Sequence, residues 1–339
     1  MAARSNADFD GQEVLAFAIE LAKKAGNAIL QGSQNRKAKA EADWESLTKK
    51  NTADLVTETD QAVEKLVKET IAAKYPTHKF IGEESWAAGE EAKLDDAPTW
   101  IVDPIDGTTN FVTGFPFCAI SIGVAYKQRP VIGVVYNPFL RRLYSAWKGN
   151  GAYLEYLDEK GAQIGQPSKL PLNPIFPLSS LRHAVVAVEW GSDRTKETIE
   201  KKTLSFARLC GNPEEGVQGG QFVRGVRSIG SAALSCCAVA EGALDLWQEV
   251  GCWAWDVCAG AVIVQEAGGA VVGSKQAFLS GASKFNDVTP EVLQGRKYVV
   301  IRAIADSEGE KGIDAQKRII KDFYGALEDW EAKSVGPSR

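Results

Sequence analysis

Two aspartates, Asp103 and Asp106, stand three residues apart in the stretch WIVDPIDGTTNF at 100–111. The apolar residues before them are typical of a buried strand. Pro104 biases Asp103 toward an extended backbone, and we expect the strand to stop there. Because Pro104 donates no hydrogen bond, the turn leaves the Ile105 carbonyl free to point outward. This arrangement would place two carboxylates and a carbonyl at the mouth of the strand.

A turn and a helix start follow these aspartates. Gly107 has no side chain, so its backbone can approach a ligand closely. Thr108, Thr109 and Asn110 are typical of the first residues of a helix, whose free N–H groups bind anions. The sequence therefore predicts an anion-binding turn directly beside two acids.

Three more acids occupy similar positions, where a strand or loop gives way to a turn or a helix. They are Asp60, Glu83 and Asp256. Each has a simpler explanation by itself. Asp60 and Asp256 could cap helices, Glu83 could form a solvated pair with Glu84, and the aspartates at 103 and 106 could merely form a turn. Together, however, acids beside an anion site would repel the anion unless a cation lay between them.

Oxygen ligands without histidine or cysteine select Mg²⁺, Ca²⁺ or Mn²⁺. A hard cation beside a phosphate pocket indicates metal-assisted hydrolysis, in which one metal makes hydroxide from water and another neutralises the leaving oxygen. The chain has only two histidines, His78 and His183, so histidine-based catalysis is poorly supplied. No Walker loop or G-x-G-x-x-G is present, which disfavours nucleotide-dependent transfer and NAD chemistry.

Composition, net charge and cysteine usage exclude several classes of partner. The 339 residues are 45% hydrophobic and carry a formal net charge of −5, without a long basic run. These features disfavour nucleic acid or a membrane surface as partners. The apolar runs are too short to span a bilayer, and the N-terminus lacks the apolar core of a signal peptide. Six cysteines without a C-x-x-C pair indicate buried, reduced thiols in a cytoplasmic protein.

Apolar periodicity predicts a first helix over about 14–31, a polar stretch to 54 and a second helix from Thr59-Asp60 to about 71. Strands are expected at 79–81 and 99–102, and a hairpin at 118–126 and 131–136. The Pro-, Gly- and Ser-rich residues 155–180 are the expected boundary between two halves.

The second half alternates between the two element types, which implies a layered α/β architecture. Strands are expected at 184–189, 226–229, 244–248, 270–272 and 298–301, and helices at 195–210, 231–240, 256–267 and about 313–327.

Several motifs resemble the inositol monophosphatase family. WIVDPIDGTTNF at 100–111 is similar to its first signature and WDVCAGAVIVQEAGG at 255–269 to its second. DLVTETD at 54–60 and FIGEES at 80–85 match the family pattern in order and spacing. The resemblance covers about residues 9–325, which we expect to form one domain with an N-terminal α+β half (about 9–160) and a C-terminal α/β half (about 180–325).

The resemblance implies a role for each matching residue. The Mg²⁺ ligands would be Glu83, Asp103, the Ile105 carbonyl, Asp106 and Asp256. The catalytic residues would be Asp60, Thr108 and Glu83. Asp60 and Thr108 would orient and activate the attacking water, because a threonine hydroxyl alone is too weak a base. The amides of Gly107 and Thr108 would hold the phosphate. The substrate's hydroxyls would meet Gly230, Ser231, Ala232, Glu249 and Asp256. Lys49 would lie on a loop near a metal.

The resemblance also implies an αβαβα sandwich, a homodimer and lithium sensitivity. The segments 155–180, 211–221 and 274–295 are longer than in compact members, and we expect such loops beside the pocket to set the leaving-group preference. They are reminiscent of fungal members, some of them linked to quinate use. Trp253 could line the alcohol pocket or simply pack.

Three hypotheses follow. The leading one is a Mg²⁺-dependent hydrolase of inositol monophosphate. The second keeps the chemistry but changes the substrate to a bisphosphate nucleotide, fructose bisphosphate or another sugar phosphate, with Arg224, Arg227 or Lys49 serving a second phosphate. The third is a regulatory homologue without turnover, although unpaired clustered carboxylates are costly to keep without a metal.

Overall fold

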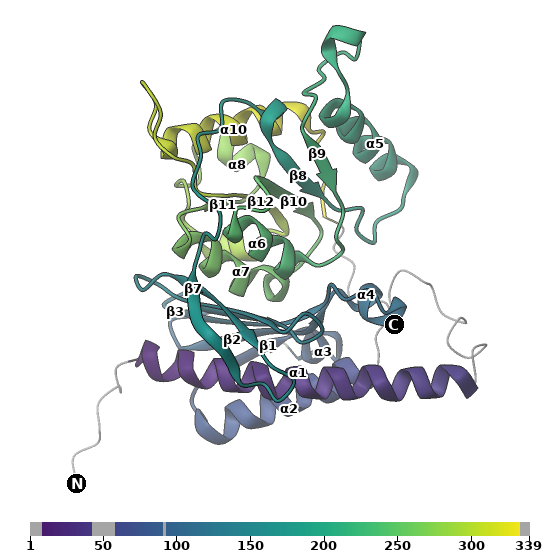
Figure 1. Ribbon diagram of the computed structural model, residues 1–339, viewed down its shortest axis with the longest axis vertical. Helices are drawn as coiled ribbons and strands as arrows, with labels where there is room; N and C mark the ends of the chain where they lie inside the picture. The colour runs from purple at the N-terminus through teal and green to yellow at the C-terminus, as the bar shows by residue number, and fades with distance from the viewer. Residues whose placement is uncertain (1–8, 43–57, 91–92, 333–339) are drawn as a thin grey trace.

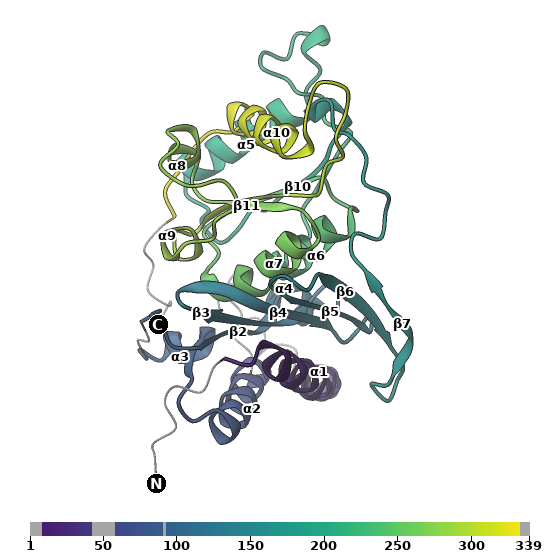
Figure 2. The same ribbon diagram turned by 90° about the vertical axis from the view of Figure 1, so that its left-hand side faces the viewer.

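The computed structural model describes residues 9–42, 58–90 and 93–332 of the chain. It has five layers, in the order helices, sheet, helices, sheet, helices (Figure 1; Figure 2). The expected αβαβα sandwich is therefore confirmed. Each boundary between a sheet and its helices is filled by apolar side chains, which form three buried clusters.

The outermost helices below the first sheet are α1 (Gly11–Ala42) and α2 (Glu58–Lys74). The first sheet has seven strands in sequence order: β1 (Lys79–Gly82), β2 (Thr99–Asp106), β3 (Ala119–Tyr126), β4 (Arg129–Asn137), β5 (Arg142–Trp147), β6 (Ala152–Leu157) and β7 (Gln163–Lys169). Strands β1 and β2 are parallel, and the remaining neighbours are antiparallel. Two short helices, α3 (Glu83–Ala87) and α4 (Thr108–Thr113), follow β1 and β2.

The second sheet has the order β11-β12-β10-β8-β9. Its strands are β8 (Val185–Val188), β9 (Gly225–Arg227), β10 (Leu246–Val250), β11 (Ala270–Val272) and β12 (Lys297–Ile301). Strand β8 runs parallel to both β9 and β10, whereas β12 is antiparallel to β10. The carboxyl ends of β8, β9 and β10 therefore meet at one edge, and the amino end of β12 joins them there.

Two helices between the sheets are α6 (Ala232–Glu241) and α7 (Ala254–Glu266). Nearly all of their residues are buried, because a helix between two sheets has apolar neighbours on every side. Helices α5 (Lys196–Cys210) and α10 (Gly312–Ala326) cover the far face of the second sheet (Figure 2). The short helices α8 (Lys275–Leu279) and α9 (Pro290–Leu293) join β11 to β12.

Two expectations about elements need correction. Helix α1 continues to Ala42 instead of ending near 31, because the polar residues after 31 include many good helix formers. Strand β2 does not stop at Asp103 but runs to Asp106, with a register shift against β3 between these two residues. Pro104 lies inside this irregularity, and a bulge is a place where a sheet tolerates proline.

The segment 155–180 does not simply connect two halves. It contains the end of β6 and all of β7, so the first sheet extends to Lys169. The small and polar residues that suggested a linker belong to an edge strand that is mostly solvent-exposed.

Two expectations from composition can be compared with the structure. All six cysteines are free; five are buried and Cys210 is exposed. In the described part of the chain, no helix combines the length and apolar character needed to cross a membrane.

Candidate active site

The parallel pairing of β1 and β2 brings the first acids together. Gly82 pairs with Val102, so Glu83 and Asp103 follow at the same edge of the sheet. Asp106 ends β2, and Asp256 enters from the first turn of α7. Asp103, Asp106 and Asp256 each offer a carboxylate oxygen, and these oxygens all lie within 4.8 Å of one another. The structure thus gathers acids that are widely separated in the sequence.

Electrostatics makes this cluster costly without a cation. Burial, and then repulsion from Asp256, raises the pKa of Asp106 to about 7. Burial and the neighbouring acids also raise the pKa values of Glu83 and Asp103 well above the usual range. The carboxyl groups of Asp103 and Asp256 are close enough for each to shift the pKa of the other. A proton or a bound cation is needed to stabilise such a group, and an all-oxygen donor set fits Mg²⁺.

Asp106 also connects the first sheet to α6. Its carboxylate accepts a hydrogen bond from the Ser231 hydroxyl and others from the amides of Ala232 at 3.2 Å and Ala233 at 2.9 Å. These donors belong to the first residues of α6, where free amides and the helix dipole favour a negative charge. The Ser231 hydroxyl and the Ala232 amide, which were expected to contact the substrate, therefore donate hydrogen bonds to Asp106 in this structure.

Asp60 and Thr108 face each other across the site. Asp60 lies in the first turn of α2 and is 1% exposed. The Thr108 hydroxyl lies 3.4 Å from Asp60 Oδ1 and 3.2 Å from the Ile105 carbonyl oxygen. A hydroxyl has one hydrogen, so these two oxygens compete for it. When Asp60 takes the hydrogen bond, the lone pairs of Thr108 Oγ1 are free to accept a proton from a water.

Gly107 makes the turn between β2 and α4 possible. It adopts a left-handed conformation with φ of 89°. A β-carbon there would lie 2.9 Å from the Phe117 carbonyl oxygen and 3.1 Å from that of Gly230. Any other residue would therefore push the 230 turn away from the acids. The expected helix start at Thr108 is confirmed by α4.

The turn before α6 is held by two side chains that the sequence did not suggest. Glu189, after β8, accepts hydrogen bonds from the Ser228 hydroxyl at 2.8 Å and from the amides of Ile229 at 2.9 Å and Gly230 at 3.1 Å. The side-chain amide of Asn110 donates to the backbone carbonyl oxygens of Phe117 at 2.7 Å and Ile229 at 2.8 Å. Glu189 and Asn110 therefore position the turn against the acids.

Glu249 is the penultimate residue of β10, at the same edge. Burial, followed by repulsion from Glu189, Asp256 and Asp106, raises its pKa well above the usual range. Its carboxylate thus lies within electrostatic reach of the acid cluster, on the wall formed by the second sheet.

A comparison with known proteins identifies the whole arrangement. The profile of the inositol monophosphatase family matches residues 10–322. The chain belongs to this family.

Two curated relatives and one solved structure illustrate the likeness. Protein qutG of Emericella nidulans is 40% identical over 319 residues, which are 92% of this chain and 92% of that protein. Inositol monophosphatase 1 of Sus scrofa is 40% identical over 261 residues, 77% of this chain and 83% of that protein. The structure of Mycobacterium tuberculosis SuhB is 27% identical, has a TM-score of 0.64 and covers 94% of this chain and 100% of its own.

The basic residues suggested for a second phosphate have different positions. Arg224 precedes β9 and lines a cavity of about 510 Å³ at the amino ends of β8 and β10, the edge opposite the acids. The exposed Arg227 side chain donates to the Val226 carbonyl oxygen at 3.0 Å. Arg224 is thus wrong as a candidate for a second phosphate at this site. Lys49 lies outside the described residues.

The three segments expected to be longer than in compact family members are also distributed unevenly. Residues 211–221 connect the end of α5 to the start of β9, and 170–180 lead to the start of β8, so both lie at the edge opposite the acids. The segment 274–295 leads to the amino end of β12, which is at the acid edge. Of the three, this segment alone leads to the site.

Trp253 packs in an aromatic cluster beside the site. Its ring stacks on Trp255 with centroids 5.2 Å apart and lies 4.3 Å from the ring of Trp86. The Arg296 guanidinium lies 3.7 Å from the Trp253 ring centroid, and the Trp253 amide donates to Asp256. These contacts show a packing role for Trp253, which also orients Asp256.

Glu64 is a further positioning residue that sequence reasoning missed. It is buried on α2, and its carboxylate accepts hydrogen bonds from the amides of Glu84 at 2.7 Å and Ser85 at 2.6 Å. These amides begin α3, whose first residue is Glu83. Glu64 therefore fixes the turn from which the Glu83 carboxylate reaches the cluster.

We expect Glu64→Ala to lower the free energy of unfolding by about 2 kcal/mol, because two amides lose a charged acceptor. The Mg²⁺ concentration needed for half-maximal activity should also rise, since Glu83 loses its support. Urea denaturation and a Mg²⁺ titration measure the two effects. Glu69→Ala, on an exposed position of the same helix, is the matched control. Unchanged values for both quantities in the Glu64 variant would exclude this role.

Proposed function

We propose that this protein is a Mg²⁺-dependent phosphate monoester hydrolase whose substrate is an inositol monophosphate. The observation that carries the proposal is the buried carboxylate cluster beside the Gly107–Thr108 turn, with the Asp60–Thr108 contact on one side. Family membership supports the same reaction class. We further propose that the protein is a lithium-sensitive, cytoplasmic homodimer that acts on small phosphate esters.

Each residue has a proposed role in binding. Glu83, Asp103, the Ile105 carbonyl, Asp106 and Asp256 would hold Mg²⁺. When bound, the ion supplies Lewis-acid chemistry, because it lowers the pKa of water and offsets charge on the phosphate and the leaving oxygen. Hydrogen bonds from the Ser231 hydroxyl and the Ala233 amide favour the ionised form of the Asp106 carboxyl group and hold it in place.

The reaction itself needs a positioned water and a fixed phosphate. The Thr108 hydroxyl passes its proton to the Asp60 carboxylate as Thr108 Oγ1 takes a proton from the attacking water, so Asp60 ends protonated and the water becomes the nucleophile. The amides of Gly107 and Thr108 hold the phosphate in line with that water. The Gly230–Ala232 turn, Glu249 and Asp256 form the wall that would receive the hydroxyl groups of the leaving alcohol.

Phosphate release from inositol 1-phosphate, measured against added Mg²⁺ with and without lithium, tests the proposal. We expect no turnover after chelation of divalent ions, restored turnover with Mg²⁺ and inhibition by lithium. Fructose 1,6-bisphosphate and a nucleotide 3′-phosphate serve as competing esters. Faster hydrolysis of a bisphosphate would replace the substrate assignment. Mg²⁺ binding without turnover of any ester would instead support a regulatory homologue.

A further inference from the structure

The wall beyond Glu249 carries a buried lysine that the proposed reaction does not yet use. Gly191, just after β8, has a left-handed φ of 58°. A β-carbon built on it would lie 3.4 Å from Lys202 Nζ and 4.0 Å from Glu249 Oε1. The ammonium group from α5 and the carboxylate from β10 therefore converge over one glycine. A side chain at 191 would lie in contact with both groups.

Both Lys202 and Glu249 retain unused hydrogen-bonding capacity. Lys202 is 7% exposed, and its ammonium donates to the Trp190 carbonyl oxygen. An ammonium has three hydrogens, and among the described residues Lys202 uses one of them, in the bond to Trp190. The Glu249 carboxylate accepts none from the residues described by the structure. Buried charges without full partners are costly, so a ligand that engages both groups would stabilise the site.

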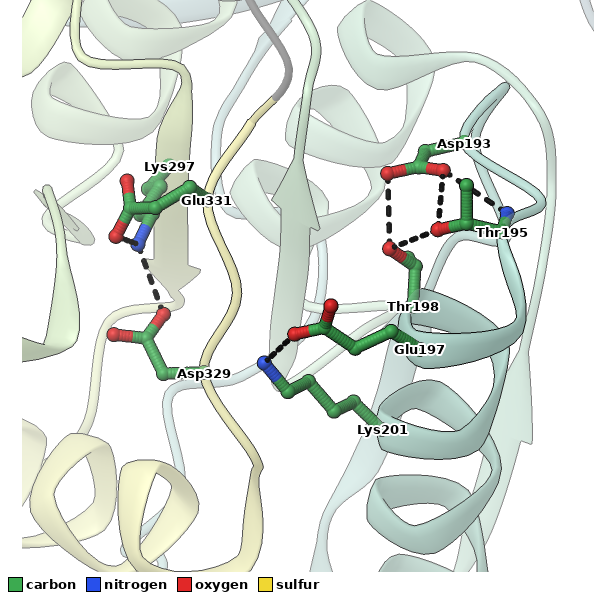
Figure 3. Close-up of polar contacts among 8 residues, drawn as sticks. All are labelled: Asp193, Thr195, Glu197, Thr198, Lys201, Lys297, Asp329 and Glu331. Carbon is green, nitrogen blue, oxygen red and sulfur yellow. Dashed lines mark hydrogen bonds and ion pairs between the residues drawn. The ribbon is translucent and has the colours of Figure 1, made fainter.

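The C-terminal strap, residues 327–332, holds Lys202 in place. Trp330 lies over the ammonium, with the nitrogen 5.5 Å from its ring centroid. Lys297, at the start of β12, pairs with Asp329 at 3.0 Å and Glu331 at 2.8 Å (Figure 3).

Further contacts fix the strap to α5 and α8. Glu328 pairs with Arg208 at 2.7 Å, and the Leu327 carbonyl oxygen accepts from Lys275 at 2.7 Å. Lys297 is also the strand partner of Val250, the neighbour of Glu249. The strap lies beyond the residues matched by the family profile, yet it covers the outer side of this wall.

We propose that Lys202 is a substrate-binding residue that acts with Glu249 to recognise two neighbouring hydroxyl groups on the leaving alcohol. This inference rests on the proposed function. One hydroxyl would donate to the Glu249 carboxylate, and the oxygen of the next would accept from the Lys202 ammonium. The substrate class is thus the monophosphate of a vicinal polyol.

A second phosphate fits this wall less well than a polyol. The carboxylates of Glu249 and Glu189 repel one another, and a further dianion would face both of them. One lysine cannot offset that charge, whereas hydroxyl groups add none and can donate to Glu249.

The test compares Lys202→Met with Lys201→Met, its neighbour on α5. Lys201 pairs with Glu197, one turn earlier on the same helix, at 2.8 Å (Figure 3). Each protein is assayed with Mg²⁺ on inositol 1-phosphate and on p-nitrophenyl phosphate, whose leaving group has no neighbouring hydroxyls. We expect Lys202→Met to lower kcat/KM for inositol 1-phosphate by about tenfold to hundredfold, as for a lost charged hydrogen bond. Its kcat/KM for p-nitrophenyl phosphate should stay within about twofold.

Two more results support the inference: full activity of Lys201→Met on both esters, and partial recovery of inositol 1-phosphate hydrolysis in Lys202→Arg. Equal losses on both esters in Lys202→Met would show a merely structural role and overturn it. No loss on either ester would overturn it as well. If the wild-type protein hydrolyses neither ester, the proposed function fails and the inference fails with it.

Discussion

Asp106→Asn is expected to abolish hydrolysis, with kcat lowered by about a thousandfold or more, since a metal supplies several kcal/mol to such a reaction. Asn keeps the size of the side chain but removes its charge. Its NH₂ group would also face one of the three donors that now meet the Asp106 carboxylate. Mg²⁺ affinity should fall together with activity. Isothermal titration calorimetry with Mg²⁺ and phosphate release from inositol 1-phosphate measure the two effects.

The variant should nevertheless fold. Burial and Asp256 raise the pKa of Asp106 to about 7, so a neutral side chain relieves repulsion in the cluster when no cation is bound. Asp245→Asn is the matched control, because Asp245 is a partly buried acid that pairs with Arg302 at 2.6 Å at the opposite edge of the second sheet. This control should lose stability but keep kcat. An Asp106 variant that retains more than about a tenth of the activity would contradict the metal assignment.

Most acids of the site could be predicted because they obey one local rule. Glu83 and Asp103 follow apolar strand residues, and Asp60 and Asp256 lie in the first turns of helices. Parallel pairing of β1 and β2 then brings the strand ends together. Periodicity located the strands of the second sheet for the same reason, since each apolar run there is short and bounded by turns.

Some residues position the site by binding the backbone of a distant element, and no local sequence pattern indicates that role. Glu64 lies on α2 and binds amides about twenty residues away, so its spacing within a helix indicates only an ordinary acid. Asn110 contacts a carbonyl more than one hundred residues away. Glu189, in contrast, could have been predicted. It ends the strand predicted at 184–189, and acids at strand ends, such as Glu83, were the candidates for the site.

Lys202 shows why a polar pattern can mislead. It belongs to the run Glu200-Lys201-Lys202, which is typical of a solvated helix face. The ion pairs of Lys297 draw the C-terminal strap across α5, and Trp330 then covers one lysine of the pair while Lys201 stays at the surface. Burial of Lys202 depends on a segment far along the chain, so it cannot be predicted from the residues near Lys202 in the sequence.

Asp60→Asn is the second variant with a large expected effect, and it should act on the chemical step instead of on binding. Asp60 Oδ1 lies 3.4 Å from the Thr108 hydroxyl but does not belong to the group of Asp103, Asp106 and Asp256 oxygens. We therefore expect kcat to fall by about a hundredfold to a thousandfold, the usual loss for a proton-transfer residue, while Mg²⁺ affinity and KM stay within a few-fold.

Thr108→Ala should give a similar loss, and the double variant should be no worse than either single one, because both side chains serve one proton transfer. Thr108→Ser, which keeps the hydroxyl, should recover most of the rate. Steady-state kinetics on the two single variants, the double variant and Thr108→Ser, with Mg²⁺ titrated, separates a loss of kcat from a loss of Mg²⁺ affinity. Additive losses would mean that Asp60 and Thr108 act independently, and a loss of Mg²⁺ affinity in Asp60→Asn would move Asp60 into the metal-binding group.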